Sequence, residues 1–136
     1  MKRGVMVLML SILAGCAHGL IAPLPDVPAD QAVTVTVIRE PQFVGSATTF
    51  LITNNGDEIV GLRQGEHIVL TLPAGDRTMG VTCFSCPHDS IFLRLEANGQ
   101  YYIRVWATAG GPRIAQLARD PAEQIIKDTE RLELGK

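Results

Sequence analysis

The chain has 136 residues, which is the length of a single domain, and its formal net charge is −2. Hydrophobic residues make up 46% of the chain and charged residues 19%, which excludes a disordered protein. Aromatic residues are only 5%, and neither a basic surface nor a set of stacking aromatics is present, so no nucleic-acid partner is expected. The mean hydropathy of +0.18 is high for a small soluble protein and points to the apolar start of the chain.

The first fifteen residues have the order of a secretory signal peptide. Lys2 and Arg3 precede a run of about ten mostly apolar residues, and small residues follow. This run is shorter than the roughly 20 residues that a membrane-spanning helix needs. We therefore expect residues 1–15 to be removed on export. The remaining chain would carry 10 cationic and 14 acidic side chains, a net charge of −4.

The segment Leu13-Ala14-Gly15-Cys16 resembles the lipobox of bacterial lipoproteins. The resemblance implies that the Cys16 thiol receives a diacylglyceryl group, that the chain is cut before Cys16, and that the new amino group takes a third acyl chain such as palmitate. Two or three such chains anchor a protein stably in a bilayer. Ala17 follows the cysteine, and by resemblance to enterobacterial sorting this favours the outer membrane, facing the periplasm. An ordinary signal peptide with a chance cysteine is the alternative.

Residues 16–31 are expected to form the lipidated cysteine and an extended tether. Pro23, Pro25 and Pro28 favour a polyproline-like conformation, which spans up to about 45 Å over fifteen residues. Such a spacer would hold a domain away from a bilayer, and His18 within it is expected to be solvated.

From residue 32 onward the pattern changes to period two, because Val33, Val35 and Val37 alternate with threonine and isoleucine. Turn signals then recur about every 8 to 12 residues, which is typical of a β-sandwich. Asn98-Gly99 predicts a hairpin turn that pairs the strands on either side of it, and would place Arg94 and Arg104 on neighbouring strands near Glu96. The expected strands are residues 32–38, 47–53, 58–62, 66–72, 77–83, 91–97, 100–108 and 113–118.

The end of the chain predicts a C-terminal amphipathic helix over about residues 120–133. Asp120 can cap it, Pro121 fits the first turn, and an apolar stripe with helical spacing follows. The helix is expected to cover a sheet edge or one end of the sandwich, and a partner-binding helix is the alternative. The predicted fold is therefore mainly β: a small antiparallel β-sandwich, prealbumin-like or immunoglobulin-like, of about seven or eight strands over residues 32–136.

Several short segments of the predicted domain resemble, in their order, a family of short bacterial lipoproteins that is catalogued as a domain of unknown function. These segments are Val37-Ile38-Arg39, Phe43-Val44-Gly45-Ser46, Gly61-Leu62, Leu72-Pro73-Ala74-Gly75 and Gly99-Gln100-Tyr101-Tyr102-Ile103-Arg104. The resemblance covers about residues 32–118 and implies a sandwich similar to PEGA and prealbumin-like modules. The family carries no established catalytic residues, so the resemblance transfers none. The loop from Cys83 to Pro87 departs from the family's pattern.

The segment from Cys83 to His88 carries the most suggestive chemistry. A disulfide between Cys83 and Cys86 is favoured, since Cys16 is expected to be lipidated and the periplasm is oxidising. A thioredoxin-type redox pair would need a helix after the first cysteine, where the sequence predicts another strand. A metal site of Cys83, Cys86 and His88, with Asp89 or a distant His67, is a further alternative, as are unpaired thiols. Haem attachment is excluded because Pro87 stands where the histidine would be needed.

The motifs of common hydrolases, metalloproteases and nucleotide-binding proteins are missing from the sequence, so no catalytic residue, cofactor or enzymatic activity is expected. The predicted function is that of a lipid-anchored cell-envelope lipoprotein, acting as a non-enzymatic binding or accessory module for an envelope protein or a glycan. The main alternative is a thiol-redox or metal-binding protein centred on Cys83, Cys86 and His88. A lipoprotein that inhibits a host or phage enzyme is a third possibility.

Overall fold

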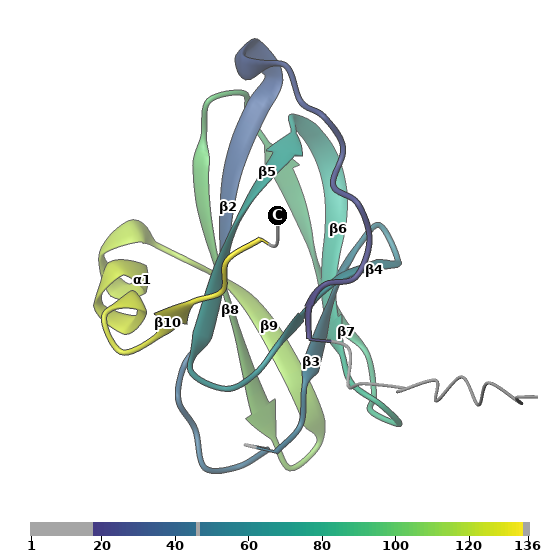
Figure 1. Cartoon of the computed structure of the whole chain (residues 1–136), viewed down its shortest axis with the longest axis vertical. Helices are drawn as coiled ribbons and strands as arrows, with labels where there is room; N and C mark the ends of the chain where they lie inside the picture. Colours follow the sequence, from purple (N-terminus) through teal and green to yellow (C-terminus); the bar gives the residue numbers. More distant parts are fainter. Residues whose placement is uncertain (1–17, 46, 135–136) are drawn as a thin grey trace, which may run out of the picture.

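The computed structural model describes residues 18–45 and 47–134, and in it two five-stranded sheets pack face to face (Figure 1). This arrangement confirms the predicted β-sandwich. The signal peptide and Cys16 lie outside the described residues. The first sheet contains, in spatial order, β1 (Gly19–Leu20), β4 (Asp57–Leu62), β3 (Phe50–Asn54), β6 (Gly75–Thr82) and β7 (Asp89–Leu95). The second contains β10 (Glu130–Arg131), β5 (Glu66–Pro73), β2 (Ala32–Arg39), β8 (Gln100–Thr108) and β9 (Gly111–Leu117).

The second sheet is mixed rather than purely antiparallel. Its central strand β2 runs antiparallel to β5 but parallel to β8, and the short β10 runs parallel to β5. The eight expected strands are all present with slightly different bounds, and the two-residue strands β1 and β10 extend the sheets at one edge each.

The core fills the space between the two sheets. Val33, Val35 and Val37 on β2 point into it, as the period-two pattern predicts, and they are essentially inaccessible to solvent. Thr36 and Ile38 point to the other face of the sheet and are also buried. Their burial follows from the helix α1 (Arg119–Ile126), which contacts β2 and β8 from outside the sandwich (Figure 1).

The predicted hairpin across Asn98-Gly99 is wrong. The strand before this turn, β7, pairs with β6 in the first sheet, whereas the strand after it, β8, pairs with β2 and β9 in the second. The turn forms its hydrogen bonds with the start of β2 instead. The N–H of Asn98 donates to the carbonyl of Ala32 at 2.8 Å, and the N–H of Thr34 donates to the carbonyl of Gly99 at 3.0 Å. The turn therefore connects the two sheets, and Arg94 and Arg104 lie in different sheets.

The segment Asn54-Asn55-Gly56-Asp57 forms the hairpin turn between β3 and β4. Asn55 and Gly56 adopt φ angles of 50° and 88°, the left-handed region that a tight two-residue hairpin turn requires. This turn lies at the end of the sandwich away from the segment that joins β2 to β3.

The segment expected as a free tether is instead packed along the sandwich. Gly19 and Leu20 form β1 and pair with β4, and the N–H of Ile21 donates to the carbonyl of Ile59 at 2.8 Å. Leu24 packs against the core, and the 3₁₀ helix η1 (Ala29–Gln31) leads into β2 at the upper end of Figure 1. Residues 18–28 run extended along the sandwich, as their prolines predict, but they do not form a spacer.

The C-terminal helix is shorter than expected and begins differently. It ends at Ile126, and the chain then turns to form β10 along the edge strand β5, where the N–H of Glu130 donates to the carbonyl of Gly65 at 2.7 Å. Ala118 occupies the N-cap position without a side-chain hydrogen bond, so Asp120 does not cap the helix. Ala122 is its fully buried residue. Within the described ranges, no helix has the length and apolar character needed to cross a membrane.

Candidate functional site

The structure brings Cys83 and Cys86 together, with their sulfur atoms in disulfide contact and their Cα atoms 5.0 Å apart. Cys83 is buried at the edge of the core, directly after β6, and Cys86 packs partly against the core. The N–H of Cys86 donates to the carbonyl of Cys83 at 3.1 Å, and Ser85 takes a positive φ of 61°, so the four residues form a tight turn. The contact supports the predicted disulfide.

The third residue of the alternative metal site, His88, faces a different part of the molecule. Its Nε2 lies 3.5 Å from Thr53 Oγ1, and its ring covers Gly80, on the outer face of the first sheet. Asp89 accepts a hydrogen bond from the N–H of Ile114 at 3.1 Å, and His67 lies on β5 in the second sheet. Among residues 18–45 and 47–134, no three His, Cys, Asp or Glu side chains are grouped as metal ligands.

A thioredoxin-type role also lacks its structural support in this turn. Such a cysteine is activated at the N-terminus of a helix that follows a strand. Here β7 follows Cys86, and Cys83 is buried. The turn is therefore best described as a tight connection between two strands, closed by the contact between the two sulfur atoms.

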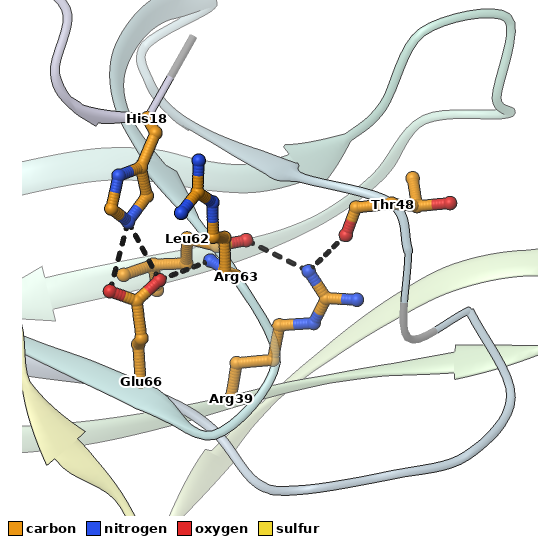
Figure 2. A network of polar contacts seen from close by, with 6 residues as sticks. All are labelled: His18, Arg39, Thr48, Leu62, Arg63 and Glu66. Carbon is orange, nitrogen blue, oxygen red and sulfur yellow. Dashed lines mark hydrogen bonds and ion pairs between the residues drawn. The ribbon is translucent and has the colours of Figure 1, made fainter. Parts of the chain in front are cut away.

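Arg39, at the end of β2, organises the segment that joins β2 to β3. Its guanidinium donates to the carbonyls of Thr48 at 2.5 Å and Leu62 at 2.8 Å (Figure 2). It also donates to the carbonyl of Gly45 at 2.8 Å and lies over the Phe50 ring. Burial lowers the pKa of Arg39 to about 10, against the opposing effect of the nearby Glu66 carboxylate, so the side chain remains charged at neutral pH. A single buried cation thus holds three carbonyl groups of this end of the sandwich.

Glu66, at the start of β5, connects this region to the N-terminal segment. Its carboxylate accepts from the N–H of Arg63 at 2.6 Å and from Nε2 of His18 at 2.9 Å (Figure 2). His18 is therefore paired, not solvated as expected. Together with β1, this contact fixes the first described residue to the body of the domain.

A second group of side chains lies on the outer face of the second sheet. Alternation along β8 places Tyr102, Arg104 and Trp106 on this face, and all three are half-buried. The Arg104 guanidinium lies 4.7 Å from the centroid of the Trp106 ring and also forms an ion pair with Glu40. Trp106 is the single tryptophan of the sequence. We call Tyr102, Arg104, Trp106 and Glu40 the β8 platform.

A cleft of about 430 Å³ adjoins the β8 platform, between α1 and the residues that follow β2. It is lined by Glu40, Pro41, Gln124, Ile125 and Asp128. Glu40 thus belongs to both features: it lines the cleft and holds Arg104. The cleft combines two carboxylates and an amide with the apolar surface of a proline and an isoleucine, so it can accept hydrogen bonds from a ligand rich in hydroxyl groups.

His67 is a buried titratable side chain on β5 that contacts Thr129, three residues after the end of α1. Thr129 donates its hydroxyl hydrogen to the carbonyl of Ile126 at 2.8 Å, so its oxygen accepts from Nδ1 of His67 at 2.7 Å. Burial lowers the pKa of His67, and the charge of Arg131 lowers it further. The residue is a packed strand histidine that ties the end of α1 to β5.

Comparisons with protein-family models, with curated proteins and with solved structures gave no match to this chain. The resemblance to a lipoprotein family therefore stays a prediction.

The β8 platform was missed by the sequence reasoning, which placed Arg104 near Glu96 on a solvated face. The partner of Arg104 is Glu40, which is 64 residues away and is brought close by the parallel pairing of β2 with β8. A sequence signal did exist: an aromatic residue, an arginine and the single tryptophan at every second position of one strand, from Tyr102 to Trp106.

Proposed function

We propose that this protein is an exported, lipid-anchored module of the bacterial cell envelope that binds a partner without catalysing a reaction. The support for export and anchoring is the sequence of residues 1–16, with its basic start, short apolar run and lipobox. The support for a binding role is the β8 platform, which is an aromatic and charged surface beside a cleft. A surface of this kind suits binding, whereas catalysis would call for a nucleophile paired with a base. The favoured location is the outer membrane, with the domain in the periplasm.

A glycan is the partner class that the β8 platform supports best. Sugar rings present apolar C–H faces that pack on aromatic side chains, and hydroxyl groups that bond to carboxylates, amides and guanidinium groups. Trp106 and Tyr102 supply the aromatic surface, while Arg104 and the Glu40 carboxylate supply the polar contacts. The observation that carries the proposal is the Arg104 side chain, which is held between Trp106 and Glu40 and is therefore preorganised.

The proposal can be tested with the fluorescence of the single tryptophan. The mature protein would be titrated with soluble peptidoglycan fragments and with surface polysaccharide while Trp106 emission is recorded. We expect a saturable change with one glycan class, and at least about tenfold weaker binding by Arg104→Ala, since a hydrogen bond to a charged group contributes about 1.5–3 kcal/mol. Arg94→Ala is the matched control, because Arg94 lies on β7 in the other sheet with its side chain 82% exposed.

Two results would argue against a glycan. One is a tryptophan signal that no glycan changes. The other is equal binding by the Arg104→Ala and Arg94→Ala variants. Crosslinking in intact cells from position 113, on β9 opposite Trp106, would then show whether an envelope protein covers this surface instead.

A further inference from the structure

His18, the first described residue, lies at a defined end of the sandwich. Gly19 is opposite Gly61 on β4, Gly61 is opposite Leu51 on β3, and Leu51 is opposite Thr82 on β6. These residues form one row across the first sheet. Because β1 runs antiparallel to β4, His18 lies toward the end of β4, at the end of the sheet that holds the start of β3 and the end of β6.

The same end carries four connecting segments: three of them we call the loop end, and the fourth is the β4–β5 turn of residues 63–65. The loop end consists of residues 40–49 between β2 and β3, residues 83–88 between β6 and β7, and residues 109–110 between β8 and β9. A small cleft of about 120 Å³ is lined by residues in or next to all three segments, among them Val44, Cys83, Cys86 and Gly111. The segments from β2 and β8 lie at the lower end of the sandwich in Figure 1.

Two phenylalanines stand out from the loop end. Phe43 and Phe84 are each 94% exposed, and Val44 beside Phe43 is also exposed. Exposed apolar side chains that gather at one end of a domain are the kind of surface that contacts a membrane or a partner. The loops are well held here, because Arg39 binds the carbonyls of Gly45 and Thr48, and Cys83 is in disulfide contact with Cys86.

The described tips of the loop end carry no charge, whereas Glu40 lies where the loop end leaves β2 and Arg63 lies on the neighbouring β4–β5 turn. Residues 41–45, 47–49, 83–87 and 106–112 contain no Asp, Glu, Lys or Arg. A surface of this kind suits the boundary between lipid headgroups and acyl chains, where aromatic side chains are stable, and it does not depend on anionic lipids.

We propose that the loop end rests on the bilayer that holds the lipid anchor, with Phe43 and Phe84 inserted at the boundary between headgroups and acyl chains. This inference rests on the proposed lipid anchor. His18, which is bound to Glu66, is two residues from Cys16, a separation of at most about 7 Å in an extended chain. The anchor would thus keep the domain against the membrane, with the β5–β6 turn and η1 facing away from it. The spacer of about 45 Å expected from the sequence would have placed it far from the bilayer.

A lipid-depth measurement tests this orientation in the full-length protein. The acylated protein would be reconstituted into vesicles of phosphatidylethanolamine and phosphatidylglycerol, with an environment-sensitive dye on Ala109→Cys at the loop end or on Asp57→Cys at the β3–β4 turn. We expect lipids that carry a nitroxide quencher to abolish emission from position 109 and to leave position 57 unchanged. The quenching should be the same whatever the fraction of phosphatidylglycerol.

Substitutions identify the residues that make the contact. In the Ala109→Cys background, Phe43→Ser with Phe84→Ser should remove the quenching, while Phe92→Ser should not. Phe92 is the matched control because it is 59% exposed but lies in the middle of β7, opposite Thr78.

The outcomes separate this inference from the anchor itself. Equal quenching at positions 109 and 57, in protein that carries acyl chains and stays with the vesicles, overturns the orientation but leaves the anchor intact. Protein that carries no acyl chain and stays in solution overturns both. The dye at position 109 could also be shielded from water in native envelopes but not in lipid vesicles. This result would overturn the orientation as well, and would show that a protein covers the loop end.

Discussion

The guanidinium of Arg39 lies over the ring of Phe50, 3.6 Å from its centroid, at the point where the core meets the loop end. Phe50 is fully buried, so one face of the cation is covered by an aromatic ring while its N–H groups bind carbonyls. This relationship connects the packing of the sandwich to the position of the segment that carries Phe43. The loop end is thus built on the core, not attached loosely to it.

Removing this cation is expected to destabilise the whole domain. Arg39→Met keeps much of the side-chain volume but leaves the carbonyls of Gly45, Thr48 and Leu62 without their donor. A buried acceptor without a partner costs about 1–3 kcal/mol, so we expect the free energy of unfolding in urea to fall by roughly 2–5 kcal/mol. Arg94→Met is the control, since Arg94 is exposed and its ion pair with Asp76 is long at 3.9 Å. Equal stability of the two variants would contradict this role of Arg39.

Gly45 is expected to be less tolerant of a side chain than Gly56. Both have positive φ angles, 71° and 88°, but a Cβ on Gly45 would lie 2.9 Å from the Cβ of Ala107, whereas one on Gly56 would meet nothing within 4 Å. Left-handed backbone costs about 1–2 kcal/mol in both alanine variants, and overpacking adds about 1–3 kcal/mol for Gly45→Ala alone. Urea unfolding of the two variants measures the difference. A Gly56→Ala variant that is less stable than Gly45→Ala would contradict the close approach of Gly45 to Ala107 on β8.

The contact between Cys83 and Cys86 predicts that the exported protein contains a disulfide. Its unreduced mass should be lower than its reduced mass by the two hydrogen atoms lost on oxidation, and neither thiol should react with an alkylating agent. A loop this short contributes about 2 kcal/mol by chain entropy, so Cys83→Ala with Cys86→Ala should lower stability by about that amount. Reactive thiols in the exported protein would contradict the disulfide and reopen the redox and metal alternatives.

The buried His67 predicts a loss of stability in mild acid. Its pKa is lowered in the folded protein, so below the ordinary value of 6.5 the unfolded chain binds a proton more readily than the folded one. The stability that His67 provides is therefore complete above that value and declines as the pH falls through it toward the lowered pKa. Urea unfolding at about pH 7.5 and about pH 5.5 should show a larger loss for the wild type than for His67→Gln. An equal loss of unfolding free energy in the wild type and in His67→Gln would contradict this role of His67.

Local patterns in the sequence were sufficient to predict the strands but not how they pair. The alternation of Val33, Val35 and Val37 predicts β2 because it reflects burial of one face, which is a local property. Asn98-Gly99 correctly signals a turn, but its hydrogen bonds go to Ala32 and Thr34, and nothing in its own residues indicates this. A hairpin and a crossover between sheets thus have the same local signal.

The contacts that define the candidate sites are mostly long-range, and for this reason the sequence did not reveal them. His18 and Glu66 are 48 residues apart, and Arg104 and Glu40 are 64 apart. The prolines of residues 18–28 correctly favoured an extended conformation but could not show that it packs against β4 and the core. The Cys83–Cys86 contact was predictable because the two residues are neighbours in a tight turn.

The most direct test of the account is the chemistry of Cys16. Mass spectrometry of the protein purified from bacterial membranes should show a chain that begins at Cys16, with a diacylglyceryl group on its sulfur and an acyl chain on its amino group. Cys16→Ser should remain uncut and should not incorporate labelled palmitate. A mature chain without acyl groups, or a Cys16→Ser variant that still matures and stays with the membranes, would contradict the lipid anchor on which the proposed function depends.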